Sequence, residues 1–298
     1  MIVAGLAWGC NRGDAADAPT VALVLKTLNS PFFIELEAGA QQAADSLGIE
    51  LVVQAPDREI DVERQMQIIE NLLQTGIDVL LLTPSGSREV VSAIAEANRA
   101  EVPVVIVDTR ADEQALAAAR ASISTFIGSD NVDGGRMAGR FVAEALGGRG
   151  RVAVLEGIPG HETGDSRLQG FREVIDGHPG ISIVASQTAN WERDQAFNVT
   201  QNMLQSHPDL QAIFAANDMM ALGAVEAIAA AGRTGDLIVV GFDALDEARQ
   251  AIRDGRMDAT IAQHPREMGR IAVESAWSIL QGDSVPAVQP VSIELVAE

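Results

Sequence analysis

The chain has 298 residues, with 42 Asp or Glu against 21 Lys or Arg, and its formal net charge is −21. A chain this acidic has no basic face to neutralise phosphates, which excludes nucleic acid and anionic lipid surfaces as expected partners. A hydrophobic fraction of 47% allows a sizeable core, the length fits about two domains, and a single cysteine excludes an internal disulfide.

Residues 1–19 are expected to be a signal or lipoprotein remnant and a linker. The apolar run MIVAGLAWG ends at Cys10, after a small residue, and a polar stretch follows, as at a bacterial lipoprotein cleavage site. We therefore predict lipid attachment at Cys10. The run is short and has no basic residue before it, so an incidental cysteine in a disordered tail is the alternative. No later segment is long and apolar enough to span a bilayer.

From residue 20 onward, short runs rich in Val, Ile and Leu alternate with segments whose apolar residues recur at helical spacing. The runs predict strands at 20–26, 49–54, 78–83, 102–108, 124–130, 151–157, 181–187, 210–218, 237–243 and 258–263. The segments predict helices at 31–48, 61–76, 87–100, 137–147, 165–177, 193–206, 220–232, 244–255 and 265–282. A loop is expected between 109 and 123. Strand followed by helix, repeated this often, predicts an α/β fold with parallel sheets covered by helices on both faces.

Two such units fit the length better than one. The first break is expected near 127–130, where the first set of helix-covered strands ends. The second is expected near Gln263, where a strand ends and the last long helix begins. No linker rich in Pro, Gly or Ser marks either boundary.

Ligands of parallel α/β sheets lie beyond the carboxyl ends of the strands, and this rule selects the candidate residues. Carboxylate, amide, guanidinium and ammonium groups suit sugar hydroxyls, and flat aromatic rings suit the C–H face of a sugar. The sequence offers both kinds of group at or near the strand ends: Lys26, Ser30, Phe32, Phe33, Asp108, Thr109, Arg167, Trp191, Asn217, Asp243 and Gln263.

Each of these residues also has a structural interpretation. Asn217 and Asp243 could cap the helices that follow them, and Asp108 could be a turn residue. Phe32 and Phe33 could staple a helix to the core. Lys26 is the only lysine in the chain; it could form a salt bridge, but arginine, which this chain uses everywhere else, would serve that purpose equally well. The pattern as a whole favours a binding site over these separate roles.

Other chemistries lack their motifs. No GxGxxG follows a strand, and neither GxxxxGK[ST] nor GxSxG occurs. The four histidines are scattered without metal-ligand spacing, so no metal or other cofactor is expected.

Several blocks resemble the periplasmic pentose/hexose-binding proteins of bacterial ABC importers, and most closely their ribose- and D-allose-binding members. The resemblance is carried by VALVLKTLNSPFF, VVIVDTR, SDNVDGGRMAG, GDSRLQGFREVI, the long block from Ala185 to Ile228, VVGFDALDEARQAI and DATIAQHPREMG. It implies two Rossmann-like lobes joined by three crossover segments, with the sugar in the cleft between them. Lobe one would be 20–129 plus 264–291, and lobe two 130–263 plus 292–298.

The resemblance also implies roles for the candidate residues. Phe32 and Phe33 would form one stacking wall and Trp191 the other, while the polar candidates would bond the sugar hydroxyls. Allose-type members carry lysine at the position of Lys26. Ribose-type members carry arginine at the position of Thr109, which argues against plain ribose, and the family commonly has asparagine at the position of Ser30. These differences favour an allose-like hexose or a related sugar.

The implied protein is a non-enzymatic, monomeric solute-binding protein in the periplasm or at the cell surface. It would capture a monosaccharide by hinge closure and deliver it to a membrane permease. Three alternatives stay open: the ligand-binding core of a lac-repressor-type regulator, a sugar-modifying enzyme on a related fold, and a sugar receptor for chemotaxis or signalling. The first would need a helix-turn-helix segment ahead of the first strand, and the second a base–nucleophile pair.

Overall fold

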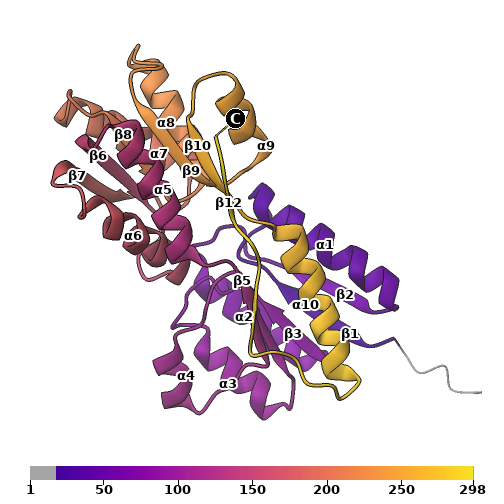
Figure 1. Ribbon diagram of the computed structural model, residues 1–298. Coiled ribbons are helices and arrows are strands. Elements are labelled where there is room, and N and C mark those ends of the chain that lie inside the picture. Colours follow the sequence, from indigo (N-terminus) through magenta and orange to yellow (C-terminus); the bar gives the residue numbers. More distant parts are fainter. Residues whose placement is uncertain (1–17, 298) are drawn as a thin grey trace, which may run out of the picture.

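The computed structural model describes residues 18–297 and contains two six-stranded sheets, one in each lobe (Figure 1). The first sheet has the order β11-β5-β4-β3-β1-β2, and the second has the order β12-β10-β9-β8-β6-β7. Neighbouring strands are parallel except for β12, which runs antiparallel to β10. The predicted α/β class with two parallel-sheet lobes is confirmed.

Lobe one contains the first sheet and five helices, and lobe two contains the second sheet and five helices. The elements of lobe one are β1 (Thr20–Val24), α1 (Pro31–Leu47), β2 (Glu50–Gln54), α2 (Val62–Gln74), β3 (Val79–Leu82), α3 (Val91–Arg99), β4 (Val104–Val107), α4 (Glu113–Ala119), β5 (Thr125–Gly128), α10 (Pro265–Leu280) and β11 (Val288–Pro290). The elements of lobe two are α5 (Asn131–Ala145), β6 (Arg149–Glu156), α6 (Glu162–Ile175), β7 (Gly180–Thr188), α7 (Arg193–Ser206), β8 (Ala212–Ala215), α8 (Asp218–Ala230), β9 (Ile238–Asp243), α9 (Asp246–Arg253), β10 (Ala259–Ala262) and β12 (Glu294–Val296).

Alternation along the strands builds a core on both faces of each sheet. In β1, Val21 and Leu23 pack with α1 and α10, whereas Ala22 and Val24 pack with α2 and α3 on the opposite face. Because both faces are covered, the central strands such as β3 and β4 are wholly apolar, which is typical of parallel sheets. The second sheet is covered in the same way, by α5 and α6 on one face and by α7 and α8 on the other.

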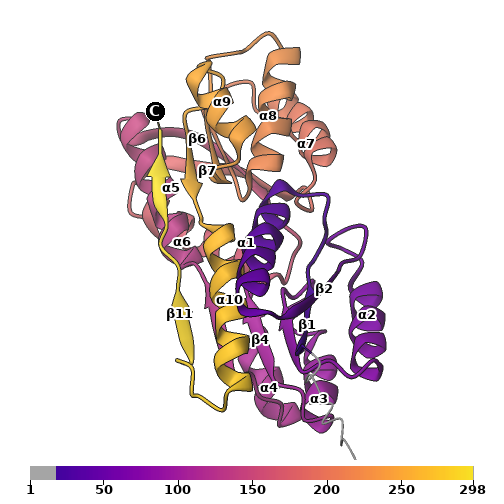
Figure 2. The same ribbon diagram turned by 90° about the vertical axis from the view of Figure 1, so that its right-hand side faces the viewer.

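The chain crosses between the lobes three times, between β5 and α5, between β10 and α10, and between β11 and β12. Figure 2 shows α10 and β11 returning along lobe one after the second crossing. Helix α10 is held closely against α1, because a Cβ at Gly39 would overlap the Arg266 carbonyl oxygen. The second crossing therefore enters a well-anchored helix.

Four elements differ from the sequence-based expectation. The helix expected at 137–147 begins six residues earlier, as α5, because Asp130 caps it by accepting from Asp133 N. The segment expected as a loop contains α4, an alanine-rich helix whose N-cap Asp112 accepts a hydrogen bond from Ala115 N at 2.6 Å. Strands β11 and β12 were not predicted, since each is only three residues long and largely exposed. The predicted lipid-attachment residue Cys10 lies outside the described residues. Within residues 18–297, the helices are all too short or too polar to traverse a bilayer.

Candidate functional site

A small enclosed pocket lies where the carboxyl ends of the two sheets face each other. Its free volume is about 30 Å³, and it is lined by Lys26, Ser30, Phe32, Phe33, Glu59, Asp108, Thr163, Arg167, Trp191, Asn217, Asp243 and Gln263. The structure thus brings together every residue predicted for the site except Thr109, and adds Glu59 and Thr163. The free space suits a water molecule rather than a sugar ring, so a sugar needs the lobes to part or side chains to move.

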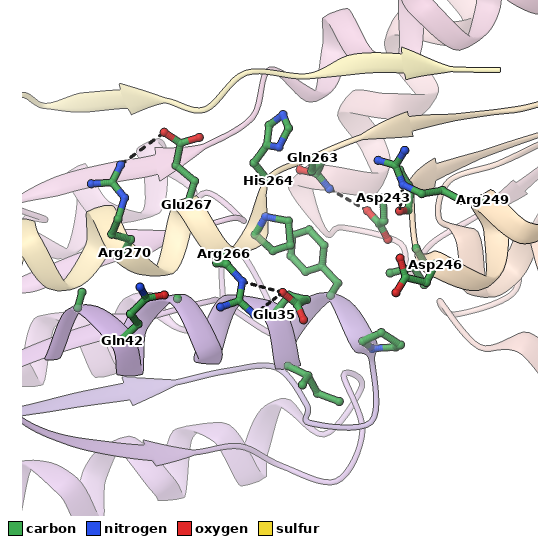
Figure 3. Close-up of a pocket in the computed structure, with 18 of the residues that line it drawn as sticks. Glu35, Gln42, Asp243, Asp246, Arg249, Gln263, His264, Arg266, Glu267 and Arg270 are labelled. Atoms are coloured by element: carbon green, nitrogen blue, oxygen red, sulfur yellow. Dashed lines mark hydrogen bonds and ion pairs between the residues drawn. The ribbon is translucent and has the colours of Figure 1, made fainter. Parts of the chain in front are cut away.

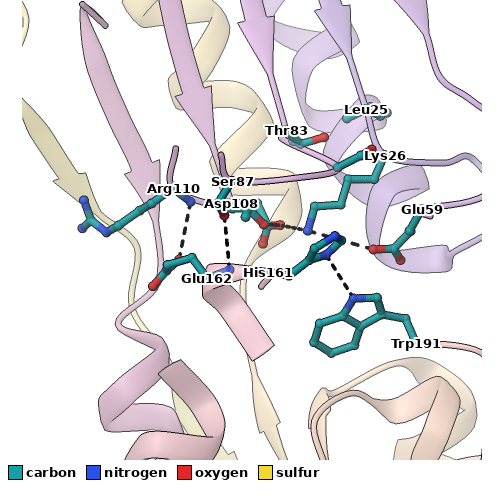
Figure 4. Close-up of polar contacts among 12 residues, drawn as sticks. Leu25, Lys26, Glu59, Thr83, Ser87, Asp108, Arg110, His161, Glu162 and Trp191 are labelled. Atoms are coloured by element: carbon teal, nitrogen blue, oxygen red, sulfur yellow. Dashed lines mark hydrogen bonds and ion pairs between the residues drawn. The ribbon is translucent and has the colours of Figure 1, made fainter. Parts of the chain in front are cut away.

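Lys26 is the cationic side chain that lobe one contributes to the pocket. Its Nζ lies 3.3 Å from Asp108 Oδ2 and 4.0 Å from Glu59 Oε2, and its side chain is 3% exposed (Figure 4). It also lies 5.7 Å from the ring centroid of Phe33. Thr109, fully buried behind the pocket, donates its hydroxyl to Asp108 Oδ2 at 2.9 Å. Thr109 therefore holds the carboxylate that faces the pocket instead of lining the pocket itself.

Arg167 is the cationic side chain that lobe two contributes to the pocket. Its hydrogen bonds hold it in a more fixed orientation than Lys26 has. Its Nε donates to Asn131 Oδ1 at 2.8 Å, and its Nη1 donates to the Ala216 carbonyl at 2.7 Å. The guanidinium stacks 3.7 Å from the ring centroid of Phe242 and lies 3.7 Å from Asp243 Oδ1. A planar group locked this way presents its remaining donors in a fixed direction.

Asp108 and Asp243 occupy equivalent places in the two lobes. Asp108 directly follows β4 and Asp243 ends β9, and these strands hold the same position in their sheets. Both residues have positive φ, 66° for Asp108 and 113° for Asp243. This backbone conformation is unfavourable for residues with a side chain, and it is typical of positions where surrounding contacts hold a functional group in place.

Three carboxyl groups and two cations line the pocket, and burial raises the pKa of two of the carboxyl groups. Desolvation raises the pKa of Glu59 to about 7, although Lys26 opposes the shift. Desolvation likewise raises the pKa of Asp243 to about 6, against Arg167 and the Gln263 amide, which lower it. The enclosed site is therefore close to electrically neutral near pH 7, and it has hydrogen-bonding groups of both kinds.

Aromatic rings enclose the pocket from both lobes. Phe32 and Phe33 lie in the first turn of α1 with their rings edge to face and their centroids 5.2 Å apart. Trp191 follows β7 and is 7% exposed, and a side chain at Gly157 would overlap its indole ring. The Trp191 Nε1–H donates to His161 Nδ1 at 3.3 Å, which fixes the plane of the ring (Figure 4).

The amide side chains combine structural contacts with the pocket lining. Asn217 caps α8 by accepting from Met220 N at 2.9 Å, as its structural interpretation predicted, and yet it also lines the pocket. Gln263 donates from Nε2 to Asp243 Oδ1 at 2.8 Å, while its buried Oε1 has no hydrogen-bond partner among the described residues. Ser30 is the N-cap residue of α1, but its hydroxyl makes no capping hydrogen bond. These atoms are available to a ligand.

A larger groove adjoins the pocket on one side. It has a volume of about 1050 Å³ and lies between α1 and α10 of lobe one and α9 of lobe two (Figure 3). Charged side chains on its walls are paired with each other, as Arg266 is with Glu35 at 2.9 Å. The groove and the pocket share Phe32, Asp243 and Gln263. The pocket, with its buried charges and open acceptor, is the better candidate site.

Sequence reasoning missed Glu59, His161 and Thr163. Glu59 lies in a charged loop several residues beyond β2, where nothing in the sequence separates it from its solvated neighbours. His161 and Thr163 lie at the start of α6, shortly after β6. The strand-end rule points to this loop, but the choice of residues depends on which of them turn toward the opposite lobe.

Comparison with known proteins places the site in context. The family described as "Periplasmic binding protein domain" matches residues 21–284. The ribose import binding protein of Haemophilus influenzae is 42% identical over 96% of this chain and 94% of its own length. The D-allose-binding periplasmic protein of Escherichia coli is 34% identical over 96% and 94%. A solute-binding protein from Actinobacillus succinogenes, solved with bound D-allose, matches with a TM-score of 0.89 and 38% identity over 94% of this chain and 97% of its own.

Proposed function

The chain belongs to the periplasmic binding protein family, and from this premise we propose that it is the sugar-binding protein of an ABC importer. It captures a monosaccharide between its lobes and presents it to a membrane permease. The observation that carries the proposal is the convergence of side chains from both lobes on one small pocket with paired charges and with a Gln263 Oε1 that has no hydrogen-bond partner within residues 18–297.

The electrostatics of the pocket favour an uncharged ligand. Lys26 and Arg167 already face the carboxyls of Glu59, Asp108 and Asp243. An anionic ligand would add another negative charge to this set, and a cationic ligand would have to displace a bound cation; both are costly in a buried site. A neutral polyol fits, because its hydroxyls donate to carboxylates and amide oxygens and accept from ammonium and guanidinium groups.

We propose an allose-like hexose as the ligand, with D-ribose as the rival. Lys26 and Glu59 place a cation and a carboxyl side by side next to Phe33, which provides extra polar groups for the additional hydroxymethyl of a hexose. Relatives of both kinds support the pair of candidates, since ribose- and allose-binding proteins align over nearly the whole chain.

Closure of the lobes is the proposed mechanism of capture. Contacts from both lobes favour the closed form once sugar is present, so the sugar shifts a population that exists without it. The released product is the unchanged sugar, and the protein acts as a monomer. A lipid on Cys10 would keep it near the permease.

Calorimetric titration with a panel of aldoses, ketoses and polyols tests the proposal. We expect D-allose or a related hexose to bind most tightly, D-ribose to bind more weakly, and sugar acids and phosphates not to bind. NMR of the sugar after incubation should show no conversion. Binding of none of these sugars would overturn the proposed function, and preference for ribose would overturn the assignment to a hexose.

A further inference from the structure

His161 lies at the meeting point of the two lobes, although it belongs to neither set of predicted contacts. It precedes α6 in lobe two, and it is 3% exposed. Its Nδ1 accepts the Trp191 Nε1–H at 3.3 Å, within lobe two. Lys26 and Asp108 of lobe one are near enough to the ring to influence its charge. The imidazole therefore lies between the Trp191 indole, which lines the pocket, and the opposite lobe.

The residue next to His161 contacts lobe one directly. Glu162 N donates to Ser87 Oγ at 3.2 Å, and Glu162 Oε2 accepts from Arg110 N at 3.4 Å; both partners belong to lobe one (Figure 4). The start of α6 thus contacts two loops of lobe one in the closed arrangement. These contacts must break when the lobes part.

From this geometry we propose that His161 is a positioning residue of the sugar site, which holds the Trp191 ring in place in the closed form only while its imidazole is neutral. The inference rests on the proposed function. A neutral imidazole has one acceptor nitrogen, and His161 uses its Nδ1 to accept the Trp191 N–H. A protonated ring carries hydrogens on both nitrogens and cannot accept from Trp191, so the hydrogen bond that orients the indole is lost.

The charged groups around His161 do not stabilise the protonated ring enough to reverse this. Lys26 disfavours a second cation, while Asp108 favours it; Glu59 is paired with Lys26 beside the ring, and Glu162 is engaged by lobe one. Burial is the largest effect, and it lowers the pKa of His161 to about 3 in the closed structure. In an open form with the ring in water, the pKa would approach its ordinary value of about 6.5.

The consequence is a pH dependence with a defined sign. The closed form binds fewer protons at His161 than the open form, so acidification from pH 7.5 to pH 5.0 opposes closure and weakens binding by about 30-fold through this residue. Glu59 and Asp243 act in the opposite sense, because their closed-form pKa values are raised and acid favours their closed form. The pH profile of sugar affinity of the unaltered protein is the sum of these opposite contributions. The contribution of His161 therefore appears only when variants are compared.

The test is calorimetric titration with D-allose and D-ribose at pH 5.0, 6.0 and 7.5. His161→Asn keeps an acceptor for Trp191 and cannot titrate, so it should bind within about threefold of the unaltered protein at pH 7.5 and about 30-fold more tightly than it at pH 5.0. His161→Ala loses the acceptor for the Trp191 N–H and should bind roughly tenfold more weakly at pH 7.5. His178→Asn is the matched control: His178 also lies in lobe two, but its Nδ1 contacts Val174 O at the end of α6. It should follow the unaltered protein.

Parallel profiles of affinity against pH for the unaltered protein and His161→Asn would overturn the role of His161. A sugar complex in which the ¹⁵N chemical shifts of the His161 ring titrate between pH 5.0 and 7.5 would overturn it too. Failure of the unaltered protein to bind any aldose at any of these pH values would instead overturn the proposed function itself. The two failures are therefore separate observations.

Discussion

Replacement of Lys26 by methionine tests the site most directly. Methionine keeps most of the length of the side chain and removes the ammonium, which lies 3.3 Å from Asp108 and is 3% exposed. Hydrogen bonds involving a charged group contribute about 1.5–3 kcal/mol each, so losing one from a bound sugar should weaken binding roughly 10- to 150-fold. Calorimetric titration with D-allose measures this loss.

The same substitution should lower stability in a pH-dependent manner. Without Lys26, Asp108 and Glu59 face each other as buried carboxyls with no cation between them, and removing one partner of a buried pair costs about 3–5 kcal/mol when the other stays charged. Lys26 lowers the pKa of Glu59, so its removal raises that folded-state pKa further. The stability present at low pH, where Glu59 is protonated, is then lost as the pH rises through this folded-state pKa. The melting temperature of Lys26→Met should fall further below that of the unaltered protein at pH 8 than at pH 5.

A double variant separates binding from stability. Lys26→Met combined with Asp108→Asn removes one of the two uncompensated carboxylates, so it should recover part of the lost stability at pH 8 while sugar binding remains weak. Arg99→Met is a control, because Arg99 forms a helix-surface pair with Glu96 and its side chain is 70% exposed. If Lys26→Met binds D-allose as tightly as the unaltered protein, the assignment of Lys26 as a sugar contact is wrong.

Three further substitutions probe the rest of the site. Glu59→Gln should raise the free energy of unfolding by up to about 3 kcal/mol at pH 8 and leave it unchanged at pH 4. The reason is that a carboxyl whose folded-state pKa is raised to about 7 destabilises the fold as the pH rises toward that value. Urea unfolding at both pH values measures the effect, and an equal effect at both would contradict the prediction. Sugar should shift tryptophan emission through Trp191, so Trp191→Phe should lose the shift and the matched Trp277→Phe should keep it; the reverse result would place the reporter elsewhere. Arg58→Ala breaks the exposed cross-lobe pair with Glu192, at 3.3 Å, and should change affinity less than about fivefold; a larger loss would mean that surface pairing drives closure.

The fold was predictable from periodicity because the central strands of both sheets, such as β3, β4, β8 and β10, are buried on both faces. Runs such as Val79–Leu82 are wholly apolar, and the helices between them carry one buried stripe. The elements that periodicity missed lack this signal. Helix α4 buries only Leu116, and β11 and β12 are short and exposed, so hydrogen bonding to neighbouring strands rather than a hydrophobic pattern makes them strands.

The site was predictable as far as it lies at strand ends. Lys26, Asp108, Asp243 and Gln263 follow or end buried strands, and the topology of a parallel sheet places such residues at one edge. Asn217 shows that a helix cap and a pocket residue need not be alternatives. Adjacency in sequence is a weaker guide, because it selects Thr109 with Asp108 although Thr109 contacts the Asp108 carboxylate and does not line the pocket.

Residues farther along a loop escape this reasoning. Glu59 lines the pocket and His161 contacts Trp191, which lines it, because their loops fold toward the opposite lobe. Their altered pKa values arise from burial that only the assembled structure creates. A charged loop and a glycine-containing loop give no such indication in the sequence. The properties of these two side chains therefore belong to the closed arrangement of the lobes rather than to any local segment.

The equivalence of Asp108 and Asp243 gives a physical reason why the lobes can open at all. Each carboxylate stands at the same place in its sheet, with positive φ, and each is paired with a cation of its own lobe, Lys26 in one case and Arg167 in the other. Opening the cleft exposes two compensated pairs to water and leaves no buried charge without a partner, so electrostatics do not lock the empty protein shut. What remains unsatisfied in the closed form, above all the Gln263 Oε1 acceptor, is what a hydroxyl of the sugar would complete. The balance between the open and closed forms can then be set by the ligand.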